Sequence, residues 1–169
     1  MSAPRHSKPD GPLPIDSPER RRLPPLLRRA WYGLNQAFRR RIADAGATPD
    51  QFTALRCLLE GDPLGMTQGE LATTMSSDPN TIASLVERME SAGWIERQPH
   101  EGDRRAYRIR IKPAGRRVYE RMREVAVALQ TEVLASVPEA GREEFLAHLA
   151  EVADACRNAA ESSPRRRQK

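Results

Sequence analysis

Two short polar stretches carry the side chains of this sequence that are best suited to binding chemistry. The first follows Asp78-Pro79 and presents small hydrogen-bonding groups and one arginine at helical spacing, namely Asn80, Thr81, Ser84 and Arg88. The second runs from Pro99 to Arg105 and ends in two adjacent arginines after Asp103. Small amides and hydroxyls can hydrogen-bond to base edges, and arginine is attracted to phosphates and to narrow minor grooves. These residues therefore suit recognition of duplex DNA, a chemistry that breaks no covalent bond.

A short helix must carry the first stretch. Asp78 is a favourable N-cap, and Pro79 suits the first helical position, where its missing amide costs nothing. Gly93 follows an apolar stripe at helical spacing, which consists of Ile82, Leu85, Val86 and Met89. At about 100° per residue, burial of this stripe leaves Asn80, Ser84 and Glu87 facing directly away from it, with Thr81 and Arg88 on the flanks. An ordinary solvated helix face is the alternative, and the neighbouring elements argue against it.

The neighbouring elements are a capped helix and a hairpin. Thr67 to Glu70 has the Thr-x-x-Glu form of a capping box, which predicts another short helix just before the first stretch. Residues 94–98 predict one strand, and residues 107–112 alternate apolar and basic side chains like a half-buried strand. Residues 63–66 could supply a third strand. The basic loop would then lie at the tip of a hairpin, where Asp103 could pair with an arginine and stiffen it; a surface turn with scattered charges is the alternative.

Three groups of residues in this stretch fit a known pattern: Thr67-x-x-Glu70-Leu71-Ala72, Thr81-x-x-x-Leu85-Val86-x-Arg88-Met89-Glu90-x-x-Gly93-Trp94-Ile95-x-Arg97, and Asp103-x-Arg105. They resemble the winged helix-turn-helix of the MarR (multiple antibiotic resistance regulator) family of transcription factors. The resemblance implies that the helix from about Pro79 enters the major groove, while Arg105 enters the adjacent minor groove and Asp103 braces it. One departure follows the second wing strand, where Ile111-Lys112 replaces the usual Leu-Thr. The candidate DNA contacts are Thr67, Asn80, Thr81, Ser84, Arg88, Asp103, Arg104 and Arg105.

Helices on both sides of this core carry apolar stripes of their own. The stripe of the first contains Leu26, Leu27, Ala30, Trp31, Leu34, Phe38 and Ile42, and those of the last two contain Val118, Met122, Val125 and Leu129, and then Phe145, Leu149, Val152 and Cys156. Thr48, Pro49 and Gln51 start a further helix that leads into the core. Long apolar helices need another surface, and a second copy of the chain is the simplest one. The family resemblance likewise implies that the first and last helices interleave in a homodimer.

Length and composition bound the architecture. The 169 residues, with a net charge of +5, suffice for one domain with a core, and the basic excess suits a polyanionic partner. We expect a mainly α fold with a small β-wing, in which a winged helix-turn-helix core at 48–112 is flanked by dimerisation helices at 23–47 and 113–160. Residues 1–22 are rich in proline and arginine and too poor in apolar side chains to fold, so we expect a disordered tail there. Residues 161–169 form a basic tail.

The cellular compartment follows from what the sequence does not contain. No run of about 18 apolar residues could span a membrane, and the N-terminus has no signal-peptide pattern. The two cysteines favour a reducing compartment. We therefore expect a cytoplasmic protein.

The resemblance also implies a small-molecule effector, because MarR-like proteins often release DNA when an aromatic or amphipathic ligand binds between the dimer helices and the winged domain. Trp31, Phe38 and Phe52 are candidate walls of such a site, with ordinary core packing as the alternative. Arg56 lies beside Phe52 at the margin of an apolar helix face, where its guanidinium could hold a ligand carboxylate. An arginine whose apolar stem is packed and whose head lies in water is the alternative.

Other functions find less support. Redox sensing would need an accessible thiol of lowered pKa, for which Cys57 beside Arg56 is the candidate, whereas Cys156 lies on an apolar stripe and is expected in the core. A winged helix that only dimerises is possible, but it has no need of Asp103-x-Arg105. Enzymatic chemistry, a metal site and a cofactor are not expected, because no nucleophile–histidine spacing, metal-ligand spacing or phosphate-binding loop occurs. We predict a homodimeric repressor that a small aromatic or amphipathic, anionic ligand releases from a pseudo-palindromic operator.

Overall fold

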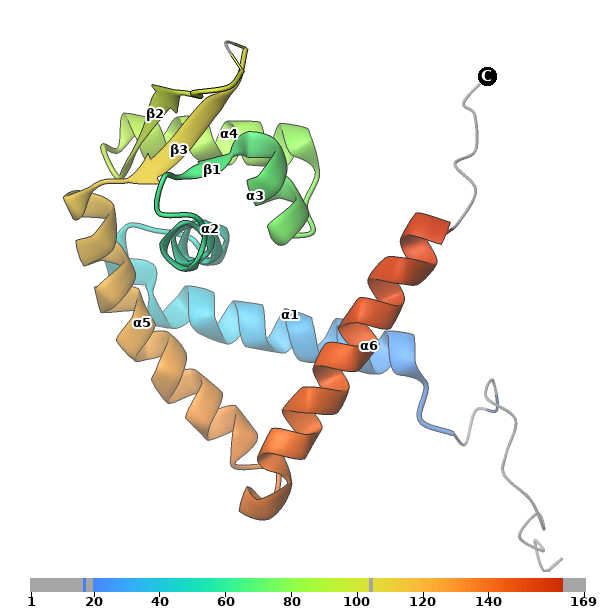
Figure 1. Cartoon of the computed structure of the whole chain (residues 1–169). Coiled ribbons are helices and arrows are strands. Elements are labelled where there is room, and N and C mark those ends of the chain that lie inside the picture. Colours follow the sequence, from blue (N-terminus) through green and yellow to red (C-terminus); the bar gives the residue numbers. More distant parts are fainter. Residues whose placement is uncertain (1–16, 18–19, 104, 163–169) are drawn as a thin grey trace, which may run out of the picture. The chain divides into compact units, whose positions relative to one another are not determined.

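The computed structural model describes Ser17, residues 20–103 and residues 105–162, in two compact units, Met1–Arg123 and Glu124–Lys169 (Figure 1). The first unit holds α1 (Leu23–Arg41), α2 (Pro49–Glu60), β1 (Met66–Thr67), α3 (Gln68–Thr74), α4 (Pro79–Ser91), β2 (Ile95–Pro99) and β3 (Tyr107–Ile111). Helix α5 (Pro113–Leu134) begins in the first unit and continues into the second, which also holds α6 (Arg142–Ser162).

Reciprocal capping boxes fix where two of the helices begin. At α2, the Thr48 N–H donates to Oε1 of Gln51 over 2.9 Å, and the Gln51 N–H donates to Oγ1 of Thr48 over 3.3 Å. Thr67 and Glu70 make the same pair of bonds at α3, over 2.7 and 3.2 Å. These bonds satisfy amides that have no partner inside the helix, as the sequence predicts. The Thr67 N–H also lowers the pKa of the Glu70 carboxyl, because it stabilises the charged form.

Helix α4 follows its sequence signals closely. The Oδ1 of Asp78 accepts hydrogen bonds from the N–H groups of Asn80 and Thr81 over 2.8 and 3.3 Å. Four side chains of its apolar stripe are exposed by 2% or less: Ile82, Leu85, Val86 and Met89. The chain leaves the helix at Gly93, whose φ of +72° lies in the left-handed region that glycine adopts at little cost. The core around this stripe is completed by Leu55, Leu71, Ile95, Ile109 and Met122.

The wing belongs to an antiparallel sheet in the order β1-β3-β2. Figure 1 shows the β2–β3 hairpin projecting from the helices of the first unit. The third strand is shorter and later than the predicted 63–66, because β1 starts at Met66, opposite Ile109 of β3. The residues before it form a turn, closed by a hydrogen bond of 2.8 Å from the Gly65 N–H to the Asp62 carbonyl.

Helix α1 is buried at its C-terminal end, through Phe38 and through Ile42, which directly follows the helix. Figure 1 shows α1 on the other side of α2 from the sheet. The α-helix stops at Arg41, before the end of the helical region predicted at 23–47. The intervening residues Ala43–Ala45 form a 3-10 turn, which Gly46 ends with a φ of +66°.

The second unit consists of the last part of α5, a turn and α6. The Nε of Arg142 donates to the carbonyl oxygens of Leu134 and Val137 over 3.1 and 3.2 Å, which fixes the chain between the two helices. A 3-10 turn at Glu139–Gly141 precedes α6, within the helical region predicted at 113–160. The prediction that Cys156 lies in the core is wrong: its side chain is exposed, because no residue of α6 is buried in the described part of the chain.

Parts of the sequence-based predictions concern residues outside the described part. These are the disordered tail at 1–22, apart from Ser17 and residues 20–22, and positions 163–169 of the basic tail. Positions 161–162 belong to α6. Among the described residues, no helix has both the length and the apolar character that a bilayer crossing requires.

Candidate nucleic-acid interface

Helix α4 presents one exposed polar face, which holds the four candidate contacts Asn80, Thr81, Ser84 and Arg88. Within the described part of the chain, none of these four side chains makes a hydrogen bond or ion pair with another residue. The residues that would lie deepest in a groove, Asn80 and Ser84, are small. A helix with such a face fits a major groove, which is about 12 Å wide, without bulky side chains holding its backbone away.

The β2–β3 loop is held together by its own side chains. The Nδ1 of His100 accepts hydrogen bonds from the N–H groups of Gly102 and Asp103 over 3.1 and 3.2 Å. The Asp103 carboxylate accepts the N–H of Arg105 over 2.9 Å, so it stiffens the loop through the backbone rather than through that guanidinium. The Arg105 side chain is exposed. Arg104 lies outside the described residues.

An open hollow of about 230 Å³ lies between the start of α3 and the wing. It is lined by Thr67, Gln68, Gly69, Arg97, Arg105, Ala106, Tyr107 and Ile109. The hollow brings together Thr67 and Arg105, two candidate contacts that are far apart in the sequence. Guanidinium groups on its rim favour an anion, and a phosphate group of a nucleic-acid backbone is of suitable size and charge.

Arg97 belongs to this surface, although the sequence does not single it out as a contact. It lies opposite Ile109 in the register of the sheet, on the face that also buries Ile95. Its Nε pairs with a carboxylate oxygen of Glu90 over 3.1 Å, which ties β2 to α4. Period-2 alternation counted from Ile95 places Arg97 on the helix-facing side of the strand and could have identified it.

Three aromatic rings pack together between α1, α2 and α5. The Phe52 ring lies edge-on to Phe38, with centroids 5.1 Å apart, and stacks on Tyr119, with centroids 5.2 Å apart. Two candidate ligand walls are therefore in direct contact, and Tyr119 joins them without a signal in the sequence. Trp31, the third candidate, precedes Phe38 by about two helical turns and is 64% exposed.

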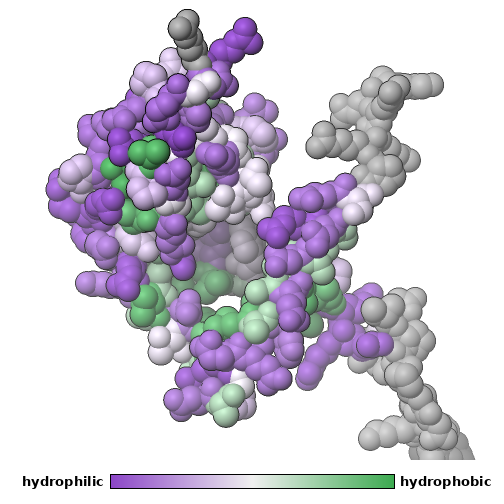
Figure 2. Space-filling model, viewed as in Figure 1, coloured by the Kyte–Doolittle hydropathy of each residue, from purple (hydrophilic) through white to green (hydrophobic). Residues whose placement is uncertain are grey.

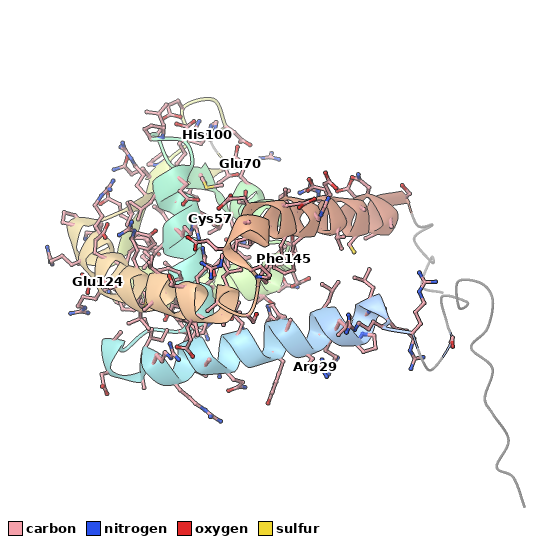
Figure 3. All side chains as sticks on the ribbon, turned by 90° about the horizontal axis from the view of Figure 1, so that it is seen from below. Arg29, Cys57, Glu70, His100, Glu124 and Phe145 are labelled. Carbon is pink, nitrogen blue, oxygen red and sulfur yellow. The ribbon has the colours of Figure 1, made fainter. Side chains whose placement is uncertain are left out.

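The polar candidates on α2 are a surface arginine and a half-buried thiol. The Nε of Arg56 lies 2.8 Å from Oε1 of Glu60, both side chains are exposed, and this hydrogen bond raises the pKa of Arg56. Cys57 follows it on the helix (Figure 3), and burial raises the pKa of its thiol. A raised pKa lowers the thiolate fraction, so this environment disfavours a redox sensor at Cys57.

The family model described as MarR family matches residues 47–107, which include α2, the helix-turn-helix and the whole wing loop. A structure described as a probable transcriptional regulator from Pseudomonas aeruginosa is 30% identical, with a TM-score of 0.67, and the match covers 75% of this chain and 93% of that one. The chain belongs to the MarR family. The expected fold, mainly α with a small β-wing, is thereby confirmed.

This MarR-family chain is similar to further regulators. PecS, an HTH-type transcriptional regulator from Dickeya dadantii, is 29% identical over 79 residues, which are 47% of this chain and 48% of PecS. The repressor CouR, in a structure bound to a 23-mer DNA duplex, is 26% identical with a TM-score of 0.69, over 76% of this chain and 89% of CouR. The chain spans about half the length of the first curated relatives that it matches. These relatives are transcriptional regulators, in agreement with the expectation that the chain is not an enzyme.

Proposed function

We propose that this MarR-family chain is a homodimeric transcriptional repressor that binds a pseudo-palindromic site in double-stranded DNA. Helix α4 enters the major groove, the wing enters the adjacent minor groove, and the hollow between α3 and the wing lies against the phosphate backbone. CouR, a 26% identical relative, is described as a repressor bound to DNA. Repression follows from steric logic, since a dimer across a promoter blocks polymerase. The proposed place of action is the cytoplasm.

The small polar face of α4 carries this proposal. Its amide, hydroxyl and guanidinium groups match the donor and acceptor patterns of base edges in a major groove. A face that served protein–protein contact would instead have an apolar or aromatic centre. Ser84 is exposed in the middle of this face, where a base can reach it.

Exposed apolar side chains on α1 support the homodimer. They are Leu23, Leu26, Trp31 and Leu34, and Figure 2 shows apolar surface along this helix. In the second unit, Phe145 and Leu149 are also exposed. Exposed apolar surface of this kind marks an interaction site, and a symmetric second copy covers such a surface on both chains at once. Two copies of α4 then read two half-sites about one helical turn apart, roughly 34–36 Å.

The decisive experiment is a binding titration on a duplex selected by this protein. A random-sequence duplex library yields the operator, and fluorescence anisotropy then measures affinity as a function of salt. Arg105→Ala lowers both the affinity and the salt slope. The slope falls by about 1, because the variant neutralises one phosphate fewer and so releases one counterion fewer from the DNA. Ser84→Ala relaxes base preference at one position of each half-site by about 1–3 kcal/mol, the value of a good base contact.

Ser91→Ala is the matched control, because Ser91 is exposed at the far end of α4. This variant retains the affinity and the base preference of the unmodified protein. If Ser84→Ala and Arg105→Ala both behave like this control on the selected operator, neither α4 nor the wing contacts DNA as proposed.

We also propose that a small aromatic or amphipathic anion releases the protein from DNA. CouR from Rhodococcus jostii RHA1 is described in complex with p-coumaroyl-CoA, and the likeness of this chain to that structure, at 23% identity, concerns the fold alone. Support from this chain comes from the exposed Trp31 and from the guanidinium of Arg56 on the surface of α2, whereas the rings of Phe38 and Phe52 are buried against each other. A thermal-shift screen of aromatic carboxylates tests this part.

A further inference from the structure

Strand β3 carries an arginine, Arg108, whose guanidinium is hydrogen-bonded to other residues of the chain. The Arg108 side chain is 15% exposed, and it alternates with the buried Ile109, so it lies on the other face of the sheet. Its Nη1 donates to the Gly65 carbonyl over 2.9 Å, and its Nε donates to Oε2 of Glu101 over 2.9 Å. The same Nη1 lies 3.9 Å from Oδ2 of Asp62. One guanidinium therefore joins the turn after α2 to the base of the wing loop.

The turn at 62–65 is a firm anchor for these bonds, because it packs directly against β3. Gly65 has a φ of +96°, and a side chain there would meet the Ile109 carbonyl oxygen at 2.6 Å and Cγ of Arg110 at 2.8 Å. A glycine is thus required by conformation and by space. The Asp62 carbonyl closes the turn by accepting the Gly65 N–H over 2.8 Å.

Arg110, two residues further along β3, makes a second connection to the same turn. Its Nη2 donates to the Pro63 carbonyl over 3.2 Å, and its Nη1 donates to Oε1 of Gln98 on β2 over 3.0 Å. Both strands of the wing are therefore fastened to the segment that follows α2. The fastening uses hydrogen bonds between polar groups, so it fixes direction as well as distance.

Arg108 and Arg105 are three residues apart but differ in what they contact. Arg105 has an exposed side chain, and in the described part of the chain its guanidinium makes no hydrogen bond. Arg108 has a carboxylate and a carbonyl as partners, and it lowers the pKa of the Glu101 carboxyl. Two of the five N–H donors of Arg108 are used inside the protein, and the neighbouring carboxylates of Glu101 and Asp62 offset its charge, so a phosphate is attracted to it less than to Arg105.

We propose that Arg108 is a positioning residue for DNA binding, which fastens the base of the wing loop to the turn after α2 and so presents Arg105 at a fixed place. The inference rests on the proposed contact between the wing and DNA. Without Arg108, the loop retains its internal hydrogen bonds through His100 and Asp103, but its orientation relative to α4 is no longer fixed. The contact of Arg105 is then made in a fraction of molecules, and the operator is bound less tightly.

A double-mutant cycle tests this role. Operator affinity and salt slope are measured by anisotropy for the unmodified chain, Arg108→Gln, Arg105→Ala and the double variant, each checked by circular dichroism and thermal unfolding. Arg108→Gln lowers the affinity on the order of tenfold and reduces the salt slope as Arg105→Ala does. In the Arg105→Ala background, Arg108→Gln causes little further loss, because the group that it positions is already absent.

Two further variants complete the design. Arg39→Gln removes one charge from the exposed side of α1, which lies across α2 from the sheet, and it leaves the affinity unchanged. Glu101→Gln removes one partner of Arg108 from an exposed position and gives a smaller loss that also vanishes in the Arg105→Ala background. This second variant decides the test if Arg108→Gln does not fold.

The outcomes separate the two hypotheses. Equal losses from Arg108→Gln in both backgrounds, or no loss in either, reject the positioning role while the wing contact stands. An unchanged affinity of Arg105→Ala alone rejects the wing contact itself, and the positioning role falls with it. A lower affinity with an unchanged salt slope in Arg108→Gln also counts against positioning, because it indicates a general loss of stability.

Discussion

Helices α4 and α1 have similar amphipathic sequences but different surroundings. The apolar stripe of α4 is exposed by at most 2%, and it closes the core of the winged helix-turn-helix. On α1, Leu26, Trp31 and Leu34 are exposed by 38%, 64% and 46%, and burial begins at Phe38. A stripe at helical spacing therefore tells that a helix needs a partner, but not whether the partner is in the same chain.

The two helices therefore differ in where their stabilising contacts come from. Around α4, the chain provides its own cover and can hold the polar face of the helix in place without help. The N-terminal half of α1 is folded as a helix, yet its apolar side contributes little hydrophobic free energy until something covers it. Dimerisation is the proposed source of that cover, and the predictions below ask whether the two helices differ in this way.

The largest effect is expected from charging the exposed stripe of α1. Leu26→Glu combined with Leu34→Glu makes the protein monomeric, because two carboxylates would be buried without partners in the proposed interface. Loss of the second binding unit lowers operator affinity by about a hundredfold or more. Light scattering after gel filtration gives the mass, and anisotropy gives the affinity.

The matched control is Tyr32→Glu, a charge on the same helix. Tyr32 is 60% exposed and lies on the polar side of α1, about 160° around the helix from Leu34. This variant remains dimeric. A dimer of unchanged operator affinity in the Leu26→Glu/Leu34→Glu protein would show that the stripe of α1 is not the interface.

A core substitution in α4 is expected to act within one chain. In the monomeric Leu26→Glu/Leu34→Glu background, Leu85→Ala lowers the free energy of unfolding by about 2–5 kcal/mol, because it leaves a cavity in a closed core. Leu23→Ala in the same background changes it within about 0.5 kcal/mol, as an exposed position does. Urea denaturation measures both. Equal costs would remove the distinction between the two helices.

The sequence was sufficient where the determining contacts are local. The caps at Thr48, Thr67 and Asp78 involve residues two or three positions apart, and each forms as its pattern predicts. The burial of the α4 stripe follows from spacing alone. The starts of capped helices can therefore be taken from the sequence in this fold.

The features that the sequence did not supply depend on contacts between distant segments. Arg97 and Arg108 lie on opposite faces of the wing sheet. Arg97 pairs with Glu90 of α4 and Arg108 binds the Gly65 carbonyl, so both partners depend on how distant segments pack together. The exposure of Cys156 has a related cause, because an apolar stripe implies a cover that the described part of this chain does not provide. Periodicity gives the face of a residue, but the fold decides what that face meets.

The N-cap of α4 should matter less than its core. Asp78→Ala lowers the free energy of unfolding by about 0.5–2 kcal/mol, because two amides lose their acceptor. Operator affinity falls as well, since the first turn holds Asn80 and Thr81. Asp50→Ala is the control, because it removes a carboxylate from the first turn of α2 without removing a cap bond, and so isolates the effect of the helix dipole. Equal effects on unfolding would assign the role of Asp78 to charge alone.

The smallest effect on stability is expected on α2, which lies between the two contrasted helices. Arg56→Ala changes the free energy of unfolding by less than about 0.5 kcal/mol, because an exposed i,i+4 ion pair contributes only that much. A loss of affinity for aromatic acids in calorimetry therefore reports a ligand contact rather than damage to the fold. Glu60→Ala breaks the same pair but keeps the guanidinium, so it should bind these acids at least as tightly as the unmodified chain. If all three proteins bind the acids identically, Arg56 does not contact the effector, and the effector would have to bind the chain elsewhere.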